Sequence, residues 1–160
     1  MARREQDRED ILREATALVE RVELEVDGMA EPVVVGFRRA SGPAFFFGAD
    51  PVYQFNSQGQ LRRGYRQGRL LKAEAGRLVE LTRERTSSQV ILRRHQLDEQ
   101  QCHEYLAELE GRLAELRAAL ESNSFRVTGQ VPVDADVVGR VVDWLAGMQG
   151  RPAIADLPNA

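Results

Sequence analysis

Residues 52–85 read VYQFNSQGQLRRGYRQGRLLKAEAGRLVELTRER, and this stretch decides the fold. Three Gly-x-Leu steps divide it, at 59–61, 68–70 and 76–78. A glycine in each polar break allows the positive φ that tight turns need, and each leucine begins the next apolar run. The pattern predicts an antiparallel meander of short strands. Within it, strand alternation places Leu61, Arg63 and Tyr65 on one face, and residues 62, 64 and 66 on the other.

The segments before this stretch predict one helix and further strands. Apolar residues at helical spacing predict an amphipathic helix over 6–20. Residues 22–26 alternate between apolar and acidic side chains, which predicts a strand with one face in water. Residues 33–37 and 44–47 predict two more strands, and 90–96 the last strand of the sheet.

The segments after the meander predict two helices. Asp98 can cap the longer one, 98–121, with Gln101 completing a capping box. Apolar residues at alternating steps of 4 and 3 form a heptad seam along it: Cys102, Leu106, Leu109, Leu113, Leu116 and Leu120. An extended segment follows over 125–133, where Pro132 favours a sheet edge, and a last helix runs to about Met148.

These elements together predict an α+β fold. We expect a twisted antiparallel meander of about seven or eight short strands, with an N-terminal helix and two C-terminal helices packed on it. Residues 1–150 are expected to form a single domain, and 151–160 a flexible C-terminal tail.

Charge is distributed unevenly along the chain. Residues 33–97 hold 12 basic against 4 acidic side chains, whereas the two flanking segments together carry −11, so the whole chain is −3. A basic, β-rich middle therefore lies between acidic, helix-rich ends. The single cysteine and the highly charged N-terminus, which lacks an apolar signal-like run, favour a cytoplasmic protein without membrane contact.

Residues able to carry chemistry are few. The sequence has no P-loop, no Gly-x-Ser-x-Gly and no zinc-ligand spacing, so we expect no catalytic residue, no metal and no cofactor. Asp50 is the one acid between Val33 and Ala73, and it precedes a proline in a loop. Together with Tyr53 and His95 it is a candidate for ligand binding, against the alternative of an Asx turn.

Three hypotheses for function remain open. The first is a small non-catalytic interaction module that binds a protein partner and self-associates as a homo-oligomer, with Leu106, Leu109, Leu113 and Leu116 at the interface unless the seam faces its own sheet. The second is single-stranded nucleic-acid binding by Arg62, Tyr65 and Arg66 on a basic, aromatic sheet face. The third is a ligand-binding or enzymatic site in a concave sheet near Asp50.

One local resemblance concerns the predicted turn after residue 55. The segment FNSQGQL, 55–61, resembles the Tyr-Asp-x-x-Gly-x-Leu unit of YD-repeat proteins, with Asn56 where that unit has its Asp. The unit occurs once in this chain. The resemblance implies a β-hairpin and carries no function.

Overall fold

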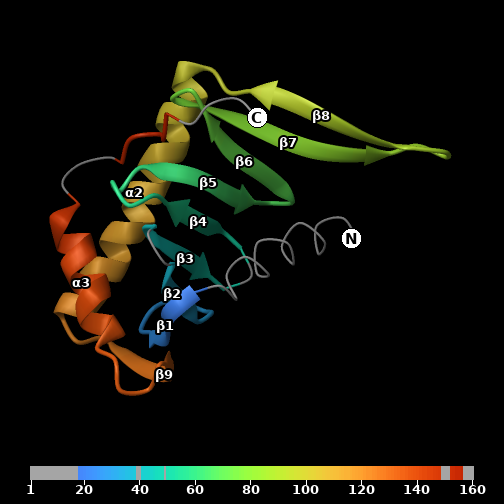
Figure 1. Cartoon of the computed structure of the whole chain (residues 1–160). Helices are drawn as coiled ribbons and strands as arrows, with labels where there is room; N and C mark the ends of the chain where they lie inside the picture. Colours follow the sequence, from blue (N-terminus) through green and yellow to red (C-terminus); the bar gives the residue numbers. More distant parts are fainter. Residues whose placement is uncertain (1–17, 39–40, 49, 149–151, 157–160) are drawn as a thin grey trace.

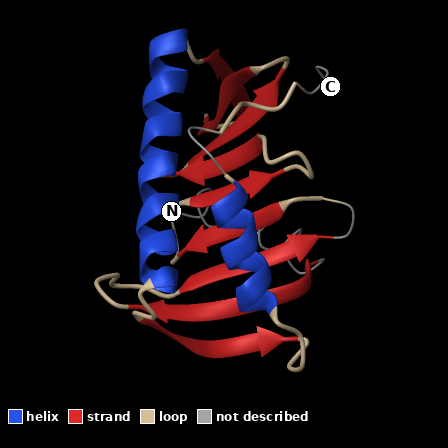
Figure 2. Cartoon of the chain, turned by 90° about the vertical axis from the view of Figure 1, so that its left-hand side faces the viewer, coloured by secondary structure: helices blue, strands red, loops and turns tan. Residues whose placement is uncertain are grey.

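The chain forms one antiparallel sheet with two helices on one of its faces, as a computed structural model describes for residues 18–38, 41–48, 50–148 and 152–156 (Figures 1 and 2). The strand order is β8-β7-β6-β5-β4-β3-β2-β1-β9, so eight strands follow one another as a meander. The strands are β1 Leu18–Val26, β2 Val33–Arg38, β3 Pro43–Phe47, β4 Val52–Phe55, β5 Leu61–Arg66, β6 Arg69–Glu74, β7 Arg77–Arg85, β8 Val90–Gln96 and β9 Phe125–Val131.

The predicted turns of the meander are confirmed. Gly59, Gly68 and Gly76 have φ angles of 78°, 81° and 77°, a region that residues with a side chain rarely adopt. Each glycine therefore lets the chain reverse between neighbouring strands. The α+β class and the mostly antiparallel sheet are likewise confirmed.

The predicted arrangement of helices needs correction. Residues 18–20, assigned to an N-terminal helix, belong to β1, where they pair with β2 because strand pairing outweighs a short helical periodicity; residues 1–17 of that prediction lie outside the described residues. The two helices, α2 Glu99–Glu121 and α3 Val137–Gly147, are not consecutive. Between them β9 pairs with β1, which brings the described strands to nine rather than seven or eight.

Helix α2 carries the chain across the sheet from β8 to β9 (Figure 2). Its 23 residues span about 34 Å at 1.5 Å per residue, which is about seven strand spacings of 4.8 Å. The predicted capping box is present, because Asp98 accepts from the Gln101 amide at 2.8 Å and Gln101 accepts from the Asp98 amide at 3.0 Å.

Apolar side chains occupy both faces of the sheet. Phe45 and Phe47 belong to the main core under the helices, whereas Phe46 lies on the opposite face in a smaller cluster with Val52 and Tyr65. This alternation follows from the two-residue period of a strand. β3 is buried at all five positions for this reason.

One face assignment within the meander is wrong. The pairing of β4 with β5 shifts between Gln54 and Phe55, so Leu61 faces Phe55 and joins the core under the helices. Tyr65 lies in the cluster on the other face. A bulge inserts an extra residue and reverses the alternation, so a simple two-residue count fails there.

The C-terminal segment differs from the flexible tail that we expected. The Leu61 amide donates to the carbonyl of Ala153 at 2.8 Å, and the Ala155 amide donates to the carbonyl of Leu61 at 2.9 Å. The Gly76 amide donates to Ala155 at 3.3 Å, and Ala155 is fully buried. Residues 152–156 therefore bind the start of β5 to the β6–β7 turn.

Candidate functional site

Asp50 connects two turns of the sheet through a hydrogen bond. Its Oδ2 accepts a hydrogen bond from the backbone amide of Gln67 at 2.7 Å, so the β3–β4 turn is tied to the β5–β6 turn. Gln67 has a φ of 53°, a strained value for a residue with a side chain. The bond differs from the Asx turn that we considered, because it reaches across the sheet rather than to the aspartate's own neighbours.

Tyr53 and Tyr105 form a buried pair between β4 and α2. Their ring centroids are 6.0 Å apart, and the exposed fractions are 0% and 1%. Neither hydroxyl has a hydrogen-bond partner among the described residues. Burial raises the pKa of each phenol well above its usual value of about 10, so both side chains stay protonated at neutral pH.

Arg66 joins β5 to α2 beside this pair. Its guanidinium lies 4.8 Å from the Tyr105 ring centroid, and its Nη1 lies 2.5 Å from Oε2 of Glu108. Gly64, two residues earlier, is buried against the Tyr105 hydroxyl. These contacts fix the middle of α2 on the sheet.

A cavity of about 470 Å³ opens near Asp50, between the β1–β2 turn and α2. Its charged lining residues are Glu31, Asp50, Arg112 and Glu115, and Phe47 forms part of the wall. The Oδ1 atom of Asp50 and the Nε atom of Arg112 are both buried without a partner among the described residues. These two atoms are therefore closed to a ligand in this conformation.

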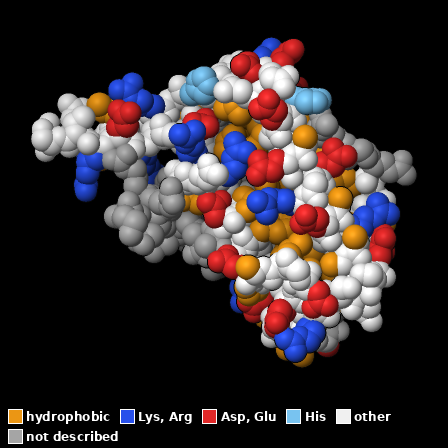
Figure 3. All heavy atoms as spheres, turned by 180° about the vertical axis from the view of Figure 1, so that it is seen from behind, with side chains coloured by type: hydrophobic (Ala, Val, Ile, Leu, Met, Phe, Trp, Pro, Cys, Tyr) orange, Lys and Arg blue, Asp and Glu red, His pale blue; other side chains and the backbone are white. Residues whose placement is uncertain are grey.

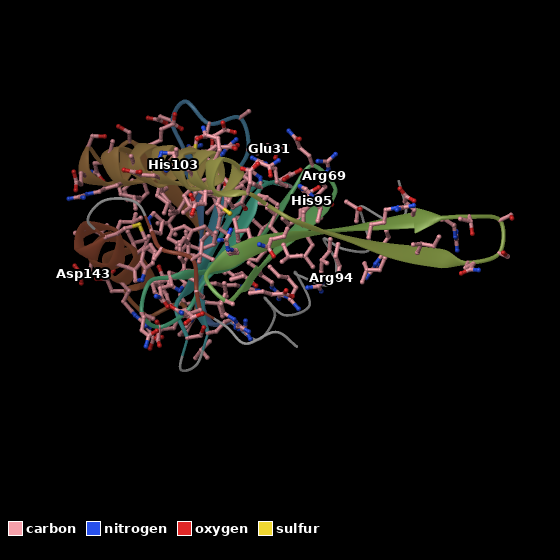
Figure 4. The ribbon with its side chains drawn as sticks, turned by 90° about the horizontal axis from the view of Figure 1, so that it is seen from above. Glu31, Arg69, Arg94, His95, His103 and Asp143 are labelled. Atoms are coloured by element: carbon pink, nitrogen blue, oxygen red, sulfur yellow. The ribbon has the colours of Figure 1, made fainter. Side chains whose placement is uncertain are left out.

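Of the other predicted site residues, His95 is placed apart from Asp50, whereas Tyr65 and Arg66 directly precede Gln67, whose amide donates to Asp50. His95 is exposed on β8 and pairs in register with Glu80, at the root of a projecting hairpin (Figure 4). Tyr65 is 1% exposed, and Arg66 is turned to α2. Arg62 is half-buried. The structure thus brings Asp50 and Tyr53 together, but it does not gather Arg62, Tyr65 and Arg66 on one open face.

The leucine seam of α2 packs on its own sheet. Leu109, Leu113 and Leu116 are at most 3% exposed and belong to the main core, and Leu106 is partly buried against it. The sequence left open whether this seam faces a second subunit. In the structure its leucines pack against the sheet of the same chain.

The outer parts of β7 and β8 project from the body as a two-stranded arm (Figure 1). We define the arm as residues 81–96, which carry four arginines and one glutamate and so a net charge of +3. In Figure 3 the arm projects to the left and carries blue side chains above and below it. Sequence reasoning identified β8 but missed the arm, because strand patterns do not show how far a hairpin extends beyond its neighbours.

One face of the arm carries exposed aliphatic side chains beside arginines. Directly paired residues share a face, so Arg83 with Leu92 and Arg85 with Val90 lie on the same side. Val90 and Leu92 are 57% and 55% exposed, and both belong to β8, the terminal strand of the sheet. Exposed aliphatic side chains beside an edge without a neighbouring described strand are typical of a contact surface.

Two arginines of β8 are paired back toward the sheet. The Nε atom of Arg93 lies 2.6 Å from Glu84 on β7, and the Nη2 atom of Arg94 lies 2.5 Å from Glu74 on β6. Both pairs are partly exposed, so each adds little to stability. Instead, the two ion pairs hold the side chains of Arg93 and Arg94 toward β7 and β6, away from the outer edge of β8.

No group of three or more His, Cys, Asp or Glu side chains in the described ranges is placed to hold a metal ion. Neither α2 nor α3 is long and apolar enough to cross a membrane. Cys102 is buried in the core as a free thiol.

Comparisons with known proteins do not assign the chain to a family. No protein-family model, no curated protein and no solved structure matches the chain.

Proposed function

We propose that the protein is a non-catalytic interaction module that self-associates, and that the outer edge of β8 is its contact element. The observation that carries this proposal is the arm, in which Val90 and Leu92 remain more than half exposed on a terminal strand. A two-stranded ribbon is marginally stable alone in water, so an arm of this length gains stability from a partner.

A second copy of the chain is the partner that fits this edge. In an antiparallel pair of β8 strands related by a two-fold axis, directly opposed residues lie on the same face of the sheet. One residue of β8 must therefore lie directly opposite its own copy, and the two-fold axis passes between them. A dyad at Arg93 or Arg94 would oppose two arginines, which is destabilising. A dyad at Leu92 avoids this and opposes Val90 to Arg94, and Ile91 to Arg93.

The two ion pairs of β8 favour this arrangement. Arginines on an edge strand ordinarily discourage pairing, but Arg93 and Arg94 are held by Glu84 and Glu74 of their own copy. The backbone of β8 is therefore left open to a neighbouring strand.

The opposite sheet edge is less suited to pairing. β9 contains Gly129, and Pro132 follows its last residue. Glycine weakens a strand and proline donates no hydrogen bond, whereas β8 contains neither. β9 also exposes Val127 and Val131, at 46% and 48%, so it offers a matched control.

A non-catalytic role agrees with the use of the polar residues near Asp50. Asp50 holds the Gln67 amide, Arg66 holds Glu108, and the two tyrosines stay neutral. Asp50 thus has a structural part in fixing the turns, and Arg66 in fixing α2. The side chains near Asp50 that would be the best candidates for catalysis are therefore used to stabilise the fold.

Sedimentation equilibrium tests the proposal. We expect a dimer for the natural chain and a monomer for Val90→Lys with Leu92→Lys, because lysines on an edge strand block pairing. Val127→Lys with Val131→Lys places the same charges on the other edge and should leave the dimer intact. A natural chain that stays monomeric at high concentration, or equal effects of the two double variants, would contradict the proposal.

A further inference from the structure

A second feature, remote from the arm, is a pocket of about 620 Å³ at the end of α3. Its walls are the β4–β5 turn, with Gln58 and Gln60, the last turn of α3, and Pro152 of the C-terminal segment. Asp143, which lies on α3 at the opposite side of the molecule from the arm, is labelled in Figure 4. The docking of residues 152–156 on β5 thus builds one wall of this pocket.

Trp144 supplies the aromatic surface of the pocket. It is the one tryptophan of the chain. The centroid of its ring lies 4.9 Å from the Phe55 ring centroid and 5.4 Å from the Phe45 ring centroid. These contacts hold the indole on the core while the side chain stays partly exposed to the pocket. The aromatic surface is therefore positioned before any ligand binds.

The electrostatics of the pocket favour positive charge. Asp143 is exposed and is the one ionisable side chain among its described lining residues. Helix α3 ends at Gly147 with no basic residue in its last turn, so its own side chains do not offset the partial negative charge of its carbonyl end. Met148 and Pro152 add apolar surface beside the indole.

The geometry points to a binding site for an organic cation, an ammonium or guanidinium group that carries alkyl substituents. A cation over an indole face is attracted by the ring quadrupole, and tryptophan is the best of the aromatic side chains for this purpose. The carboxylate of Asp143 and the carbonyl end of α3 add to that attraction, and Met148 contacts the alkyl groups. This site does not depend on the self-association proposed for the arm.

Ligand-observed NMR of the full chain, with choline as the probe, tests this inference. We expect saturable saturation transfer to the methyl protons of choline and none to sodium succinate at equal ionic strength. Asp143→Asn should weaken choline binding by about three- to ten-fold, because it removes one partly screened charge. Trp144→Phe should weaken it further, since phenylalanine is a poorer cation partner.

Asp156→Asn is the matched control, because Asp156 is exposed on the docked segment but does not line the pocket. It should leave choline binding unchanged, and thermal unfolding should show that all three variants fold. A peptide with trimethyl-lysine distinguishes a free cation from a cationic side chain, since at least ten-fold tighter binding than choline would identify the latter. Absent saturation, equal binding of succinate, or full affinity in Asp143→Asn would overturn the inference.

Discussion

Gly64 and Tyr105 should behave as one unit in folding. A Cβ atom at position 64 would overlap the Tyr105 hydroxyl and would lie 3.3 Å from its Cζ and 3.1 Å from the Val52 carbonyl oxygen. Because Tyr105 is 1% exposed, its ring cannot move aside without displacing α2. Overpacking of this kind costs about 1–3 kcal/mol, so we expect Gly64→Ala to lower the free energy of unfolding by about 2–3 kcal/mol.

Tyr105→Phe provides the matched second variant. The hydroxyl that it removes is buried without a partner among the described residues, and such a group costs about 1–3 kcal/mol. We therefore expect Tyr105→Phe alone to raise the free energy of unfolding by up to about 1 kcal/mol. In the double variant the clash is relieved, so its stability should return to within about 1 kcal/mol of the natural chain.

Urea unfolding at equilibrium measures all four proteins of this cycle. We expect a strong non-additive term between the two substitutions, since the alanine is tolerated once the hydroxyl is absent. Additive effects of the two substitutions would refute it. A loss of more than about 1 kcal/mol in Tyr105→Phe alone would likewise show that the hydroxyl has a partner.

Three further predictions concern the rest of the fold. Gly111→Ala should raise the free energy of unfolding by about 0.5–1 kcal/mol in urea, because the added methyl group meets no atom within 4 Å and alanine favours a helix; a loss of stability would show that this surface of α2 is occupied. Deletion of residues 152–160 should cost about 2–4 kcal/mol by thermal unfolding, since it removes three backbone hydrogen bonds and the buried Ala155, and an unchanged melting temperature would contradict the docked segment. The free energy of unfolding should fall above about pH 10, because the tyrosines ionise there in the unfolded chain, whereas burial raises the pKa of Tyr53 and Tyr105 in the folded chain and keeps them protonated. A melting temperature that is flat from about pH 9 to 11 would argue against their burial.

Local turn and capping chemistry made much of the fold predictable. Gly59, Gly68 and Gly76 marked the turns, and Asp98 with Gln101 marked the start of α2. Features that depend on distant pairing were not predictable. The sequence carries no local sign of the β5 bulge, of β9 beside β1, or of the bonds between Leu61 and the C-terminal segment.

The same division applies to the candidate sites. Asp50 and Tyr53 are close in sequence, and the β3–β4 turn keeps them close in space, so a local pattern could identify them. His95 was grouped with them by residue type alone, and the meander places it several strands away. The exposure of Leu92 and the pocket beside Trp144 depend on the final shape, which no spacing rule reports.

The most direct test of self-association through β8 is oxidation of single-cysteine variants. In a pair with its dyad at Leu92, the two copies of residue 92 are opposed at about 4.5–5.5 Å between Cα atoms, a distance that suits a disulfide. The natural Cys102 is buried and should not interfere. Leu92→Cys should therefore give a disulfide-linked dimer under mild oxidation at low protein concentration. Val90→Cys, which is equally exposed but faces Arg94 of the second copy, should stay largely unlinked. Equal linking of the two variants, or none in either, would contradict the account.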